Sequence, residues 1–152
     1  MTLEKQDAEL FYELWFPLLD FVNQKYRVCP GTGTIDRSRG VDAADAKKIA
    51  DYLWSHTQVL QEYIAYAKLP EEQAQIVAGW VQCKPGKYIM ERHLKKGTVF
   101  ISEDDQTVYM VEGLFSTWEE MMGKGPVLLD AVLIPFKDMI ISDGLVTAYP
   151  FH

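Results

Sequence analysis

The periodicity of apolar residues changes near residue 86, and this change limits the possible folds more than any other feature of the chain. Before Gly86, apolar residues recur every three or four positions, as on the buried face of a helix. After Gly86 they alternate or form short β-branched runs, which is typical of strands. Helices followed by strands favour the α+β class.

The first stretch predicts helices up to residue 83. An apolar stripe over residues 10–22 indicates an amphipathic helix. Pro17 interrupts this stripe, so it either kinks one helix or opens a second.

A long helix is the next prediction, over residues 42–67. Asp42 is a good N-cap, and His56 lies on the apolar stripe of this helix. A further helix is expected to begin at Pro70, which suits a first helical position, and to stop at the Lys84-Pro85-Gly86 turn.

The second stretch predicts a meander of short strands. They are expected over residues 87–94, 98–101, 107–111, 127–134, 139–141 and 145–148. The Lys95-Lys96-Gly97 break predicts one hairpin, and Asp143-Gly144 predicts another between the last two strands. A capping-box pattern from Ser116 to Glu119 predicts a short helix over residues 117–122.

The expected architecture is N-terminal helices packed on a C-terminal antiparallel sheet or small, partly closed barrel. The length of 152 residues and a hydrophobic fraction of 48% are enough for one buried core. We therefore expect a single domain over residues 1–152, with a helical subregion over 1–83 and a β subregion over 87–149.

Charge and cysteine usage restrict the partners and the compartment. A net charge of −7 repels phosphate backbones, so nucleic-acid binding is not expected for the chain as a whole. Neither a signal peptide nor a membrane-spanning run is visible. Cys29 and Cys83 fit neither a CxxC motif nor a zinc site, so we expect thiols in a reducing cytoplasm.

The stretch PGTGTIDRSRG, residues 30–40, is either a phosphate cradle or a joint between helices. Its glycine spacing differs from that of phosphate-binding loops, no lysine follows its last glycine, and no strand precedes it. Asp42 and Asp45 already place negative charge at the start of the next helix. A joint is the favoured interpretation.

The leading functional hypothesis is a non-enzymatic binding or protein-interaction module without a cofactor or metal. A binding surface is expected where the sheet meets the helices. Its candidate residues are Tyr88, Arg92, His93 and Trp118. No segment supplies the three or four ligands that a metal needs.

Two alternatives are kept open, both in the segment 84–96. Lys84, Lys87, Lys95 and Lys96 form a possible basic patch beside Arg92. Such a patch could bind RNA if it converged with the stacking faces of Tyr88 and Phe100, although hairpin lysines mostly solvate a sheet edge. Alternatively, Glu91 and His93 would lie on one strand face and could serve a small-molecule enzyme.

The segment from Val132 to Leu145, which contains LIPFKDMIISDGL, resembles a hairpin of uncharacterised bacterial proteins, some of them linked to SEC-C metal-binding tails. In these proteins an LPF-type turn leads to a strand that ends in a DGL turn. The tryptophan-rich helical first half is similar in style. This resemblance implies a bacterial domain of unknown function and no catalytic residues. The cysteine-rich tail is absent here, so no metal function carries over.

Overall fold

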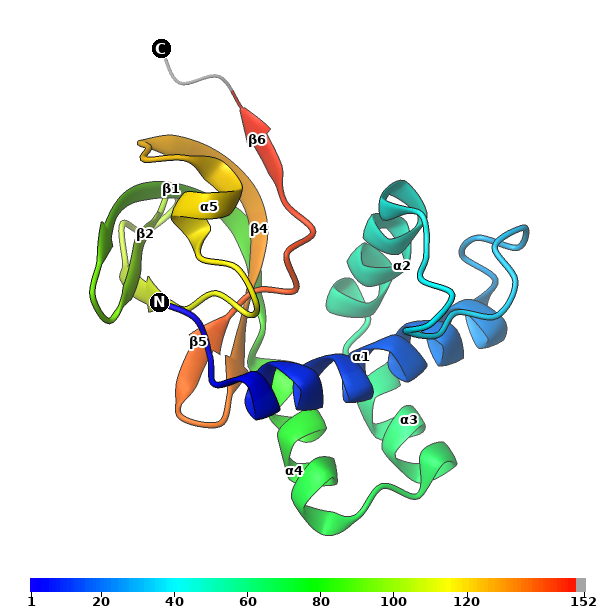
Figure 1. Cartoon of the computed structure of the whole chain (residues 1–152). Coiled ribbons are helices and arrows are strands. Elements are labelled where there is room, and N and C mark those ends of the chain that lie inside the picture. The colour runs from blue at the N-terminus through cyan, green and yellow to red at the C-terminus, as the bar shows by residue number, and fades with distance from the viewer. Residues whose placement is uncertain (150–152) are drawn as a thin grey trace. The chain divides into compact units, whose positions relative to one another are not determined.

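The computed structural model describes residues 1–149, which form two compact units (Figure 1). The helical unit contains residues 9–81, and the β unit contains residues 1–8 and 82–149. Helices precede an antiparallel sheet that curls into a half-barrel, which confirms the α+β class. The expected boundary near 84–86 lies a few residues beyond the observed one. That both parts form a single domain stays a prediction.

Four α-helices build the first part of the chain. They are α1 (Lys5–Tyr26), α2 (Ala43–Ser55), α3 (Val59–Ala67) and α4 (Glu71–Gly79), and a short 3-10 turn, Trp80–Gln82, follows. One continuous α1 runs through Pro17, so this proline does not open a second helix. Phe11 lies against Trp15 and Trp80 at centroid distances of 6.0 and 5.4 Å, which gives the helical unit an aromatic interior.

The prediction of one long helix over residues 42–67 is wrong, because the helix stops at His56. The Ser55 hydroxyl donates to the Asp51 carbonyl at 2.8 Å, and His56 Nδ1 lies 2.8 Å from the Tyr52 carbonyl. These side chains satisfy carbonyls of the last turn, and His56 leaves the helical region with φ −134° and ψ 59°. Helix α3 begins after a short turn and continues the same apolar stripe, so periodicity does not reveal the break. Asp42 caps α2, as predicted, by accepting from the Ala44 amide.

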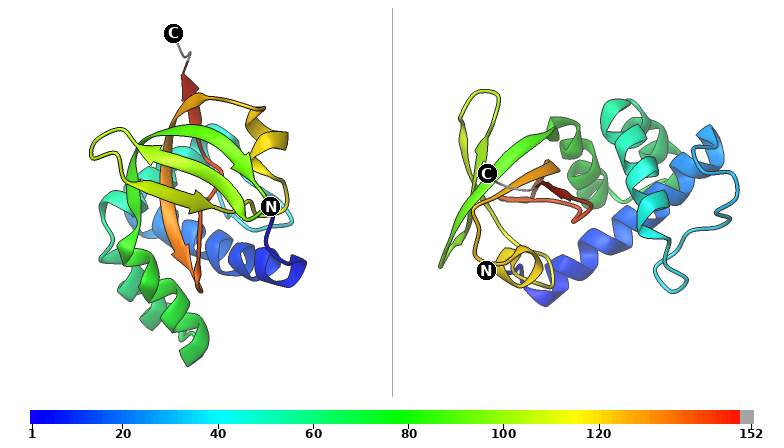
Figure 2. Two further views of the ribbon diagram at one scale, coloured as in Figure 1. Left: turned by 90° about the vertical axis from the view of Figure 1, so that its left-hand side faces the viewer. Right: turned by 90° about the horizontal axis from the view of Figure 1, so that it is seen from above.

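The sheet of the β unit has six strands. They are β1 (Lys84–Leu94), β2 (Gly97–Ser102), β3 (Val108–Val111), β4 (Val127–Phe136), β5 (Met139–Ile141) and β6 (Thr147–Tyr149). Their order is β3-β2-β1-β4-β5, and β6 pairs with residues 128–130 of β4. Leu94 pairs with Gly97, which confirms the first predicted hairpin. Figure 2 shows the curl of these strands from two directions.

Two predicted turns in the β unit are wrong. Residues 84–86 belong to β1, where Pro85 pairs with Val132 of β4. Pro85 fits there because the pairing of β1 with β2 begins only at Tyr88, so the other side of the proline is an edge. Asp143-Gly144 is not a hairpin, since β6 pairs with β4 and not with β5. Instead, Asp143 Oδ1 accepts from the Leu145 amide in a local turn.

A short helix, α5 (Trp118–Met122), carries the largest side chain of the β-unit interior. Its capping box joins Thr117 and Glu120, one residue later than the sequence pattern indicated. The Trp118 ring packs edge-on against Phe100 at 4.9 Å, and its Nε1 donates to the Glu112 carbonyl at 3.3 Å. The surrounding core consists of Tyr88, Met90, Phe100, Val111, Leu129, Ala131 and Leu133.

We predict that Gly113→Ala destabilises the β unit by about 2 kcal/mol, because overpacking forces the backbone to shift. A Cβ on Gly113 would lie 2.1 Å from the Ser116 carbonyl oxygen, in the loop that leads to α5. Urea unfolding followed by the amide NMR signals of the β unit measures the change. Gly86→Ala is the matched control, because its Cβ would meet the Tyr88 ring at an ordinary 3.8 Å. Equal stability of the two variants would contradict this account of the loop.

Candidate functional site

The structure buries two of the four residues predicted as a binding surface. Tyr88 and Trp118 are 3% and 2% exposed and belong to the β-unit core. The Tyr88 hydroxyl donates to the Lys84 carbonyl at 2.6 Å, and burial raises the pKa of this phenol to about 12. Arg92 is exposed and lies 3.4 Å from the Glu91 carboxylate. A binding role for Arg92 and His93 stays a prediction.

His93 has both ring nitrogens in hydrogen-bond contact within the β unit. Nδ1 lies 2.8 Å from the Thr98 hydroxyl, and Nε2 lies 2.8 Å from the Gly123 carbonyl. A carbonyl only accepts, so Nε2 carries a proton, and in the neutral ring Nδ1 accepts from Thr98. The ladder is irregular between Met90 and Arg92, which places a bulge at Glu91. The prediction that Glu91 and His93 lie on one face assumed regular alternation of side chains along the strand, and the bulge interrupts this alternation.

The lysines of the basic segment do not converge with aromatic faces. Residues 84–94 form one strand, so Lys84 and the hairpin at Lys95 lie at opposite ends of β1. Tyr88 and Phe100 are buried, so the expectation that they offer stacking faces is wrong. Over residues 1–149, no group of three or more His, Cys, Asp or Glu residues could hold a metal, and no helix could cross a bilayer.

The two ends of the curled sheet meet at a seam, which we define as the space between β3 and β5. Every neighbouring pair in the order β3-β2-β1-β4-β5 is antiparallel, so β3 and β5 run in the same direction. The Glu112 amide donates to the Ile140 carbonyl at 2.9 Å. Beside this contact lies a groove of about 870 Å³. The groove is lined by residues of β3, of the β4–β5 turn and β5, of the lysine hairpin and of the N-terminus: Val108, Tyr109, Met110, Glu112, Asp138, Met139, Ile140, Lys95, Lys96 and Met1.

The backbone of β3 presents unpaired groups to this seam. The Ser102 amide donates to the Thr107 carbonyl at 2.9 Å, and the register then pairs Phe100 with Tyr109. Antiparallel pairing alternates, so Tyr109 bonds to β2 while the amides and carbonyls of Val108 and Met110 point away from it. Within the described chain, those groups of Val108 and Met110 have no backbone partner.

The side chains of β3 give the seam an outer and an inner face. Val108 and Met110 are 62% and 38% exposed, whereas Tyr109 points inward and contacts the Tyr88 ring at 6.1 Å. A second hollow of about 130 Å³ lies at the inner face, lined in part by Tyr109, Leu133 and Ile140. The two hollows therefore share Tyr109 and Ile140. Sequence patterns did not reveal this site, because it depends on which strands lie at the edges of the sheet. The lysine-rich hairpin at Lys95 and Lys96 was the only local signal of a sheet edge.

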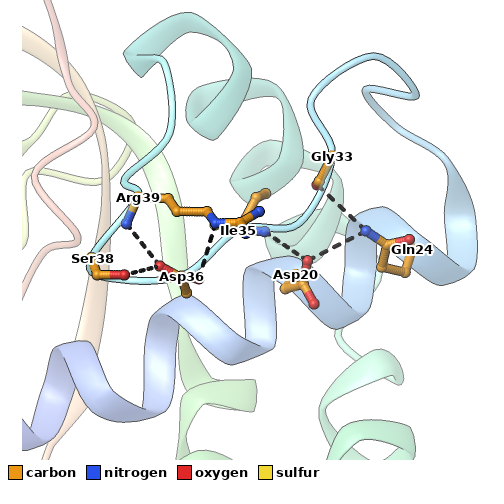
Figure 3. Close-up of polar contacts among 7 residues, drawn as sticks. All are labelled: Asp20, Gln24, Gly33, Ile35, Asp36, Ser38 and Arg39. Atoms are coloured by element: carbon orange, nitrogen blue, oxygen red, sulfur yellow. Dashed lines mark hydrogen bonds and ion pairs between the residues drawn. The ribbon is translucent and has the colours of Figure 1, made fainter.

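The loop over residues 30–40 is held by carboxylates. Asp20 Oδ1 accepts from the Ile35 amide at 2.9 Å, and Asp36 Oδ1 accepts from the Arg39 amide and the Ser38 hydroxyl, both at 2.7 Å (Figure 3). The hydrogen bond from the Arg39 amide, followed by that from Ser38, lowers the pKa of Asp36. Two loop amides thus donate to carboxylates, and the Thr32 and Gly40 amides donate to the carbonyls of Cys29 and Asp36, which supports the interpretation as a joint.

Comparisons with models of known protein families, with curated proteins and with solved structures find no match for this chain. The resemblance of residues 132–145 to a bacterial hairpin family stays a prediction.

We predict that hydrogen exchange distinguishes the two sides of β3. The amides of Tyr109 and Val111 should exchange slowly because they pair with β2, and those of Val108 and Met110 at least about tenfold faster because they face the seam. Amide exchange followed by NMR on the full chain measures this. The Glu112 amide, bonded to Ile140, serves as an internal control at the closed end of the seam. Equally slow exchange at all these positions would mean that the seam is closed.

Proposed function

We propose that the protein is a non-enzymatic peptide-binding module that takes up an extended segment of a partner protein as an additional strand between β3 and β5. The observation that carries this proposal is the seam: two strand edges joined near Glu112, with unpaired backbone groups beside an open groove. An exposed sheet edge is a template for strand addition, in which main-chain hydrogen bonds supply affinity.

The direction of the bound segment follows from the topology. Because β3 and β5 are parallel to each other, a segment that pairs antiparallel with β3 is antiparallel to β5 as well. It would bond to the free groups of Val108 and Met110 on one side. On the other side, Ile140 lies opposite Pro135 of β4, which has no amide to donate. The Ile140 carbonyl therefore faces the seam, where it already accepts from the Glu112 amide.

The side chains of the seam specify the chemistry of the segment. Residues of a strand alternate between its faces, so every second residue would point to the inner hollow. That hollow of about 130 Å³ has room for one aliphatic side chain. Lys95 and Lys96 form the turn beside the Glu112 end of β3, where an antiparallel segment begins. We therefore expect an aliphatic anchor and an acidic residue near the N-terminus of the segment.

The setting that we propose for this module is the bacterial cytoplasm. The two thiols, Cys29 and Cys83, support a reducing compartment. The bacterial origin rests on the resemblance of residues 132–145.

The test is selection from a phage-displayed library of random twelve-residue peptides on the full chain. Enriched peptides, made synthetically, should carry an acidic residue before alternating aliphatic residues and should bind measurably by calorimetry. In the variant Val108→Pro/Met110→Pro, binding should weaken by at least about thirtyfold, because two hydrogen bonds of about 1 kcal/mol each are lost. The matched variant Val108→Ala/Met110→Ala keeps both amides and should lose less.

Charge variants test the lysine contacts separately. Lys95→Glu/Lys96→Glu should weaken binding of the enriched peptides about tenfold, whereas Lys124→Glu, in the exposed loop before β4, should change it less than twofold. The proposal fails if no peptide is enriched. It also fails if the proline variant, shown by its amide spectrum to be folded, binds as tightly as the parent chain.

A further inference from the structure

A second groove, of about 740 Å³, lies entirely within the helical unit. It is bounded by the second half of α1, by the loop residues 34–36 and by α3. Nothing in the strand-addition proposal uses it, because the seam belongs to the β unit.

One wall of this groove is aromatic. Phe21 of α1 lies 5.0 Å from the Tyr66 ring and 5.4 Å from the Tyr63 ring of α3. Tyr63 is buried, but Tyr66 is 73% exposed. An aromatic ring that exposes most of its surface beside a groove offers a face for stacking or for contact with a cation.

The rim of the groove carries more negative than positive charge. Asp20, Asp36 and Glu62 line it together with one lysine, Lys25, and Arg39 Nε lies 3.8 Å from Asp36 Oδ2, so the carboxylates exceed the cations by one. Each carboxylate is fixed by donors: Asp20 by the Ile35 amide, Asp36 by the Arg39 amide (Figure 3), and Glu62 by the Tyr26 hydroxyl and Lys25. The hydrogen bond from Tyr26 and then that from Lys25 lower the pKa of Glu62, so this carboxylate is ionised at neutral pH.

Lys25 shows how a cation sits in this groove. Its Nζ lies 3.0 Å from Glu62 Oε1 and 5.7 Å from the centre of the Phe21 ring. The Lys25 side chain is 46% exposed, so water screens its attraction to Glu62 and the ion pair is weak. The Lys25 ammonium can therefore be displaced by a ligand that binds the Glu62 carboxylate and the Phe21 ring more tightly.

We propose that the groove binds the guanidinium group of an arginine side chain presented by a basic peptide. A planar guanidinium can stack on Tyr66 and Phe21 while it donates to Glu62, and it is less strongly hydrated than an ammonium. The excess of carboxylates over cations on the rim selects a positively charged ligand. Lys25 competes with this ligand for Glu62.

The test uses acetylated, amidated tri-arginine as the probe, titrated into the full chain and followed by NMR. Shifts should concentrate on Phe21, Glu62 and Tyr66. The tri-citrulline peptide, which has the same shape without charge, should bind at least about tenfold more weakly. Glu62→Gln and Tyr66→Ala should each weaken tri-arginine binding about fivefold, whereas Glu72→Gln, on the exposed side of α4, should not.

The variant Lys25→Met gives the sharpest readout, because it should strengthen tri-arginine binding about threefold to fivefold by removing the competing ammonium. Lys48→Met, exposed on α2, makes the same change in net charge and should have little effect. The proposal is overturned if both lysine variants strengthen binding equally, which indicates attraction to the acidic protein as a whole. Tighter binding of spermidine than of tri-arginine would overturn it in favour of a polyamine site.

Discussion

The hydrogen bond between the Glu112 amide and the Ile140 carbonyl joins the two ends of the sheet, and the shape of the β unit depends on it. β3 and β5 meet at this bond, and a groove separates them beside it, so the curled sheet is a half-barrel with a seam. Trp118 supports the same geometry, because it fills the interior against Phe100 and donates to the Glu112 carbonyl. The Glu112 carbonyl, next to the seam, is thus fixed by a side chain of the core.

Strands and helices of this chain could be predicted where the local chemistry decides them. The lysine hairpin at Lys95 and the N-cap at Asp42 appear in the structure, and the change from helices to strands occurs two residues before Gly86. The break at His56 could not be predicted, because the apolar stripe continues across it. The Asp143-Gly144 pair misled for the opposite reason: its local turn is real, but the following strand finds a better partner in β4.

The candidate sites were harder to predict than the fold, because both depend on contacts between distant segments. Tyr88 and Trp118 looked like binding residues, yet burying large aromatic rings is what a small sheet needs for its core. Val108 and Met110 have no distinctive sequence signal, and their backbone matters only because β3 ends the sheet. In the helical unit, the loop over residues 30–40 matters less for its glycines than for Asp36, which lines a groove with residues of α1 and α3.

Isotope-filtered NMR of a labelled chain with one selected, unlabelled peptide tests the central claim most directly. Strand addition at the seam predicts nuclear Overhauser contacts from the peptide backbone to the Met110 amide on one side and to β5 residues near Ile140 on the other, in an antiparallel pattern. Contacts confined to a different surface, or to only one of these two edges, would contradict the account.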